Sequence, residues 1–284
     1  MRAFRSILVI GLAVWTSSLS SFELGGLDPL KITEILAKGV KSFGDVPEET
    51  EIQIGKDLSA GLLGTTPLVD DPVVQNYVNR IGRWLTMQTE RPDLPWTFAV
   101  IDTDTVNAFA APGGYVFVTR GLFLMLRNEA ELAGVIGHEI SHVLRRHHLV
   151  AIEKQMRASL ATDLTGMLVD YDSEMVDALV GAGMELYAKG LDREDEFEAD
   201  GMGVVVAARS GYDAYGLPAM LMTLYESSET DQNLTFLFST HPPTVDRLEN
   251  LDQEMQGRMD RYSGAAGQTK RFQEIQKRLH GGSA

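Results

Sequence analysis

The sequence predicts a mainly helical α+β protein with one small β-sheet. Apolar residues recur at helical spacing over most of the 284-residue chain. Two short stretches near the middle are instead rich in β-branched and aromatic residues and are bounded by Asp, Pro and Gly, which is typical of strands. Long helical segments around one short strand region indicate the α+β class.

Each expected element follows from its local pattern. Pro72, directly after Asp71, suits the first turn of a helix. The strands are expected in WTFAVID (96–102) and GGYVFVTRG (113–121). Helical spacing predicts helices over 29–43, 48–63, 72–89, 132–148, 151–169, 173–188, 194–209, 214–227 and 244–255. The polar tail over 264–284 is expected to fray.

Composition and charge exclude several classes of protein. With 40 acidic and 25 basic side chains, the formal net charge is −15, which argues against a nucleic-acid surface and against simple attraction to anionic lipid. The chain has no cysteine, which excludes disulfides, thiolate chemistry, cysteine-type zinc sites and a lipoprotein anchor. Because no repeat or linker divides the sequence, we expect one domain over residues 21–284, with its core over about 70–256.

The first twenty residues have the layout of a secretory signal peptide. Arg2 and Arg5 precede an apolar run over 7–15, the polar stretch TSSLSS follows it, and cleavage is expected after Ser20. The alternatives are an uncleaved anchor and a mitochondrial presequence, although the run is short for a span and is not amphipathic. No later segment reaches the ~18 uninterrupted apolar residues of a transmembrane helix. We therefore expect an exported protein without a span after the signal.

The stretch GHEISHVLRRHH (137–148) contains four of the six histidines. On a helix, His138 and His142 lie one turn apart on the same face and can bind one ion, while Glu139 is rotated by about 100° towards the open side of that ion. A zinc ion held in this way lowers the pKa of its water, and the carboxylate can take the proton as the water attacks a carbonyl. The pattern predicts a hydrolytic centre that lacks one ligand. Two solvated histidines are the alternative.

The acidic run DREDEFEAD (192–200) offers the missing ligand. Such a run is more often the start of a helix with a solvated face. Glu196 and Asp200, however, are spaced i, i+4 and can face the same neighbour. Ala199 and Gly203 are small enough to let another helix come close. One carboxylate could then complete a His2Glu zinc site, and the other could hydrogen-bond a ligand imidazole and fix its tautomer.

Together these motifs resemble the zinc metallopeptidase family that includes HtpX, the CAAX prenyl proteases, the Oma-type mitochondrial proteases and the BepA- and LoiP-like periplasmic proteases. HExxH is followed by RxxExxAD at 193–200. NAFAAPGGYVFVTRGL (107–122) is similar to the family's strand ahead of the zinc helix, and THPPTVDRL (240–248) is similar to its late THPxxxxR element. The four elements occur in the right order over about half of the chain.

The resemblance implies a zincin-like, gluzincin-type metalloprotease domain with one Zn²⁺ per chain. His138, His142 and Glu196 would be the zinc ligands, Glu139 the general base, and Asp200 the support of the histidines. It further implies a periplasmic zinc-dependent endopeptidase for misfolded envelope proteins, with unfolded polypeptides and envelope assembly machinery as partners. The chain departs from HtpX and the prenyl proteases, which are integral membrane proteins, and from BepA, which carries a helical repeat domain.

A second hypothesis comes from another class of protein. A zinc-stabilised chaperone or binding module could dock unfolded envelope proteins and rarely cleave them. The intact Glu139 favours the enzyme, because a pure binder has no need of a base beside the metal.

Several other residues have both an ordinary and a functional interpretation. We expect Gly113, Gly114, Tyr115 and Val116 to begin an edge strand that offers its backbone to an extended peptide, although the glycines could simply form a turn.

His241 and Arg247 lie in the late element. His241 is either a rigid loop residue or, as the BepA-like resemblance implies, a residue at the active site that approaches the metal, donates to the oxyanion or blocks the site as an inhibitory fourth ligand. Arg247 is either a surface residue or a cation near the developing negative charge. His147 and His148, five and six residues past His142, fall off the ligand face and are expected to be solvated and without a catalytic role.

Overall fold

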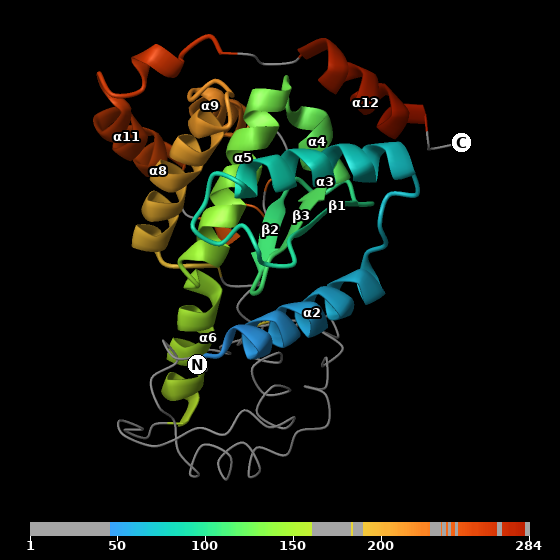
Figure 1. Ribbon diagram of the computed structural model, residues 1–284, viewed down its shortest axis with the longest axis vertical. Coiled ribbons are helices and arrows are strands. Elements are labelled where there is room, and N and C mark those ends of the chain that lie inside the picture. Colours follow the sequence, from blue (N-terminus) through green and yellow to red (C-terminus); the bar gives the residue numbers. More distant parts are fainter. Residues whose placement is uncertain are drawn as a thin grey trace, which may run out of the picture.

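A computed structural model describes residues 46–160, 190–227, 244–265 and 269–281, together with Gly183, Leu234, Leu237, Thr240 and His241. The expected signal peptide over 1–20, the helix over 29–43 and, apart from Gly183, the helix over 173–188 lie outside these residues. Helices surround one small sheet (Figure 1), which confirms the predicted α+β class.

The elements follow one another along the chain in a fixed order. The strands are β1 (Thr97–Ile101), β2 (Ala108–Ala111) and β3 (Tyr115–Thr119). The helices are α2 (Glu48–Thr65), α3 (Pro72–Thr86), α4 (Arg120–Met125), α5 (Glu129–Leu144), α6 (His147–Leu160), α8 (Arg193–Arg209), α9 (Gly216–Ser227), α11 (Thr244–Met255) and α12 (Thr269–Gly281). Among the described helices, none combines the length and the apolar character needed to cross a membrane.

The three strands form a mixed sheet in the order β1-β3-β2. β3 pairs in parallel with β1 and antiparallel with β2. The expectation that Tyr115 and Val116 form an edge strand is therefore wrong, because both lie in the central strand. Gly113 and Gly114 instead form the turn from β2 to β3, with φ of 75° and 106°, a conformation that favours glycine.

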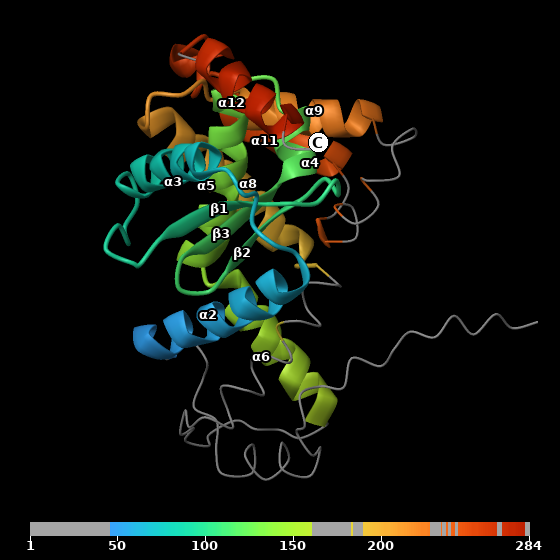
Figure 2. The ribbon, with the colours of Figure 1, turned by 90° about the vertical axis from the view of Figure 1, so that its right-hand side faces the viewer.

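The sheet is packed on both faces, with α3 and α2 on opposite sides (Figure 2). Phe98 and Val116 belong to the main core, which contains residues of α3, α5, α8 and α9. On the other face Phe109 and Phe117 stack with ring centroids 5.2 Å apart, next to Leu62 of α2. This alternation follows from the two-residue period of a strand.

One buried carboxylate, Glu51, holds α2 against the body of the protein. Its oxygens accept hydrogen bonds from Arg91 at 3.0 and 2.9 Å and from the backbone N–H of Gly113 at 3.2 Å. Nη2 of Arg146, in the turn between α5 and α6, lies 2.9 Å from Oε2 of Glu51. Glu51 therefore joins α2 to two turns of the chain far away in sequence.

The expectation that the tail frays is wrong for residues 269–281, which form α12. Phe272, Ile275 and Leu279 share one buried face of this helix, at helical spacing. Nε2 of Gln276 donates to the backbone oxygen of Leu126 at 2.7 Å. A stripe of apolar residues thus packs this helix onto the protein, although its average composition is as polar as that of a frayed tail.

Candidate metal centre

The site depends on an unusually close approach of α5 and α8, which lie side by side in Figure 1. A Cβ atom on Gly137 would lie 2.8 Å from the backbone oxygen of Gly203, and one on Gly203 would lie 2.7 Å from the backbone nitrogen of His138. Because neither position has room for a side chain, the two helices meet backbone to backbone. All sixteen residues of α5 are buried, so its polar side chains point at other protein groups rather than at water.

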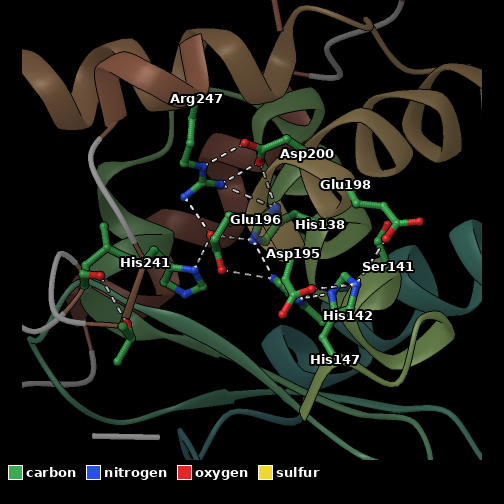
Figure 3. Close-up of polar contacts among 12 residues, drawn as sticks. His138, Ser141, His142, His147, Asp195, Glu196, Glu198, Asp200, His241 and Arg247 are labelled. Carbon is green, nitrogen blue, oxygen red and sulfur yellow. Dashed lines mark hydrogen bonds and ion pairs between the residues drawn. The ribbon is translucent and has the colours of Figure 1, made fainter. Parts of the chain in front are cut away.

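This contact brings the predicted ligands together (Figure 3). Nε2 of His138 and Nε2 of His142 lie 3.0 Å apart on α5. On α8, Oε2 of Glu196 lies 3.5 Å from Nε2 of His138, and Oε1 of Glu196 lies 3.4 Å from Nε2 of His142. With His241, these residues offer four donor atoms within 4.8 Å of one another, which is a group that could hold a metal ion.

The charges of the group suit a cation. Burial lowers the pKa of His142 well below its ordinary value, so this imidazole is neutral with a free lone pair. Burial raises the pKa of Glu196, but the positive charges of His241 and Arg247 outweigh this effect and hold it well below the usual range. Oε1 of Glu196 is buried without a partner in hydrogen-bond geometry among the described residues. An ionised, incompletely bonded carboxylate beside the neutral imidazole of His142 fits a divalent metal ion.

Asp200 supports His138 from the side away from this group. Its Oδ1 lies 2.8 Å from Nδ1 of His138, and Arg247 donates to both oxygens of Asp200, at 2.7 and 2.6 Å. Burial raises the pKa of Asp200, but its interactions with Arg247 and His138 together lower it by more. An ionised Asp200 accepts a hydrogen bond from the N–H at Nδ1 of His138, which leaves the lone pair of Nε2 free for a metal.

Arg247 lies within the centre, not on the surface. Besides Asp200, its Nη1 lies 3.2 Å from Oε2 of Glu196. The sequence suggested a cation near the reacting carbonyl, and the structure places the guanidinium between two buried carboxylates. Its positive charge therefore offsets the negative charges of Glu196 and Asp200.

Glu139 lies beside the donor group and is 2% exposed. Its Oε2 is buried without a hydrogen-bond partner in the part of the chain that the structure describes. Burial raises its pKa, opposed by the neighbouring His138. A carboxyl with a raised pKa and an uncommitted oxygen is suited to take up and return a proton.

Two small apolar cavities flank Glu139 and His241. One, of about 90 Å³, lies between α2 and the sheet, and the other, of about 30 Å³, lies between α5 and α9. The first includes Leu58, Leu62, Asn107, Ala108, Phe109 and Phe117 in its lining, and the second Leu122, Val135, Leu217, Met220, Leu221 and Leu224. Thus β2, which the sequence did not reveal as a separate strand, is the strand beside Glu139.

The expectation that His147 and His148 are solvated is wrong, because they are only 4% and 8% exposed. A helix continuing to residue 148 would have carried them off the ligand face. Instead α5 ends at Leu144, and Arg146 has a left-handed backbone with φ of 57°, so the chain turns and α6 starts at His147. Burial lowers the pKa of His148 to about 3, so this imidazole is neutral. No glycine or proline marks this turn in the sequence.

Comparison with known proteins gives the site a family context. The model of peptidase family M48 matches residues 72–255. The chain is 34% identical over 205 residues to the beta-barrel assembly-enhancing protease of Escherichia coli (strain K12), which covers 70% of this chain and 42% of that protein. It is 30% identical over 220 residues to the mitochondrial metalloendopeptidase OMA1 of Schizosaccharomyces pombe, which covers 75% of this chain and 63% of that protein. The chain thus spans less than half of the bacterial relative.

Proposed function

The chain belongs to peptidase family M48, and from this premise we propose that it is a zinc-dependent endopeptidase. One observation carries the proposal: the carboxyl of Glu139, buried and with an uncommitted oxygen, lies beside a group of donor atoms from His138, His142 and Glu196. A base beside a metal centre is what peptide hydrolysis requires.

In this proposal His138, His142 and Glu196 hold the zinc ion. When bound, zinc polarises the scissile carbonyl and lowers the pKa of a water molecule. Glu139 takes the proton of the attacking water and returns it to the leaving amine. Asp200 keeps the proton of His138 on Nδ1, at 2.8 Å, and Arg247 keeps Asp200 and Glu196 ionised.

His241 has a separate role in the proposal. It is the fourth residue of the donor group. Catalytic zinc sites keep one coordination position open for water and substrate, whereas sites with four protein ligands are closed. We therefore assign His241 to a closed resting form, from which it must withdraw before a peptide can be cleaved.

The substrate class follows from the relatives and from the cavities. Two bacterial relatives, from Escherichia coli and Yersinia pestis, are named as beta-barrel assembly-enhancing proteases. We propose that this chain acts on misfolded envelope proteins in the periplasm, in contact with the envelope assembly machinery. The signal-like segment over 1–20 supports export, and the apolar cavities beside Glu139 suit the apolar side chains that misfolded proteins expose.

The rival hypothesis, a zinc-stabilised binding module, is favoured by the closed arrangement of four donors. The two hypotheses differ in what Glu139→Gln does to cleavage of an unfolded outer-membrane protein. Under the proposed mechanism the variant keeps zinc and loses at least ~100-fold in kcat. Equal cleavage by both proteins, with equal zinc content, would exclude Glu139 as the base, and binding without cleavage by either would support the module.

A further inference from the structure

We propose that His147 is a positioning residue of the metal centre, which accepts a hydrogen bond from Nδ1 of His142 and so directs Nε2 of His142 at the metal. The inference rests on the proposed function, in which His142 is a ligand. It assigns a role to a residue outside the HExxH and RxxExxAD motifs.

The contact between the two rings is direct and buried. Nδ1 of His142 lies 2.9 Å from Nδ1 of His147, and Figure 3 shows how the two rings lie. The ring centroids are 5.1 Å apart and the rings are inclined at 70°, so the nitrogens meet edge to edge rather than by stacking. Both side chains are shielded from water, which would otherwise compete for the bond.

The proton on this contact can be assigned from chemistry. Two ring nitrogens at hydrogen-bond distance require one donor and one acceptor. Nε2 of His142 faces Nε2 of His138 at 3.0 Å and Oε1 of Glu196 at 3.4 Å, and as a metal ligand it needs its lone pair. The hydrogen of His142 is therefore on Nδ1, and Nδ1 of His147 accepts a hydrogen bond from this N–H.

The far side of His147 has the surroundings that this assignment requires. If Nδ1 of His147 accepts, its own hydrogen is on Nε2 and must face negative groups. Nε2 lies 3.4 Å from Oε2 of Glu198 and 3.7 Å from Oδ1 of Asp195. Nε of Arg145 holds the other oxygen of Glu198 at 2.7 Å. Two carboxylates at the start of α8 thus favour the tautomer of His147 that can support His142.

Each ligand histidine then has its own support. Asp200 accepts from Nδ1 of His138 at 2.8 Å, and His147 accepts from Nδ1 of His142 at 2.9 Å. Groups that orient a ligand histidine in this way typically contribute 10–100-fold to metal affinity. His147 could instead only fill space at the start of α6, and an experiment must separate these two roles.

A matched pair of variants makes the separation. In His147→Asn the side-chain oxygen can take the place of Nδ1 and accept the hydrogen bond. The leucine of His147→Leu has nearly the same shape as asparagine but offers no acceptor. We would measure zinc affinity by competition with a chromophoric chelator and check folding by thermal unfolding without metal. We expect Leu to weaken zinc binding by ~10–100-fold and Asn to stay closer to the wild type. Equal zinc affinity in the Leu variant and the wild type, or a larger loss in Asn than in Leu, would overturn the proposal.

Two further measurements keep the test decisive. ¹⁵N-labelled histidine in the zinc-loaded wild type should show a protonated Nδ1 on His142, and a protonated Nε2 would contradict the assignment even if the Leu variant fails to fold. The double variant Asp195→Asn/Glu198→Gln leaves both rings in place and should also weaken zinc binding, by a smaller factor; unchanged affinity would remove the carboxylates from the arrangement. A wild type that binds no zinc would refute the proposed function itself, whereas zinc binding that is indifferent to His147 would refute only this inference.

Discussion

Nδ1 of His241 lies 2.9 Å from Oε2 of Glu196, although the two residues are 45 positions apart in sequence. Burial lowers the pKa of His241, but the Glu196 and Glu139 carboxylates together raise it by more. The carboxylate that we propose as a zinc ligand is therefore also the partner of the residue that we propose closes the site.

Replacing His241 tests which of its possible roles is correct. If it is the closing ligand, His241→Ala opens a coordination position and raises the initial rate of cleavage several-fold. The measurement is the rate on an unfolded substrate at matched zinc content. A large fall in kcat with zinc retained would instead identify His241 as a donor to the transition state.

The third ligand can be tested within one turn of α8. We expect Glu196→Ala to lose zinc, because the group then keeps only its imidazoles and has no carboxylate to offset the charge of the ion. Glu198→Ala is the matched control and should keep zinc, since Asp195 remains beside His147. Metal per chain, determined on purified protein by mass spectrometry, decides the outcome. Zinc retained in Glu196→Ala would point to His241 as the third ligand.

Arg247 should control acid stability. The pKa values of Glu196 and Asp200 are lowered from ordinary values of 4.5 and 3.8, so their ionised forms stabilise the fold above those values. In the metal-free protein, we expect the free energy of unfolding to fall as the pH drops below this range towards the lowered pKa values. Arg247→Met leaves two buried charges without their cation and should cost ~3–5 kcal/mol. Its acid transition should begin at higher pH, as monitored by circular dichroism; an unchanged transition would contradict this account.

The contact between α5 and α8 can be tested at a single glycine. Gly203→Ala places a Cβ 2.7 Å from the backbone nitrogen of His138, so the helices must separate. We expect a loss of ~1–3 kcal/mol in stability together with weaker zinc binding. Gly64→Ala, at a helical position where a Cβ would meet nothing within 4 Å, is the control and should leave zinc binding unchanged without lowering stability. Similar effects of the two substitutions would argue against the close approach.

The sequence was sufficient where local spacing decides the structure. HExxH requires a helix, and the i, i+4 spacing of Glu196 and Asp200 predicted two carboxylates on one face of a second helix, which the structure places beside His138 and His142. The small residues Ala199 and Gly203 likewise indicated close packing, and both lie at the contact or in the core.

The remaining features depend on contacts that spacing does not reveal. The left-handed turn at Arg146 carries no glycine, so a continuous helix was the natural prediction and His147 was assigned to the surface. The order of strands depends on the pairing of β1 with β3, which joins residues 18 positions apart in sequence and leaves Tyr115 in the central strand. Arg247 finds its partner Asp200 on α8, 47 positions away.

If the proposed metal site is correct, the contact between Glu51 and Arg146 connects α2 to it. A left-handed backbone costs an L-residue roughly 1–2 kcal/mol, and at Arg146 the guanidinium's contact with Glu51, at 2.9 Å, helps to hold it there. If α2 detaches, this turn loses a restraint, and the next residue along the chain is His147. By thermodynamic linkage the effect runs both ways: by whatever factor the docked helix tightens zinc binding, bound zinc tightens the docking of the helix.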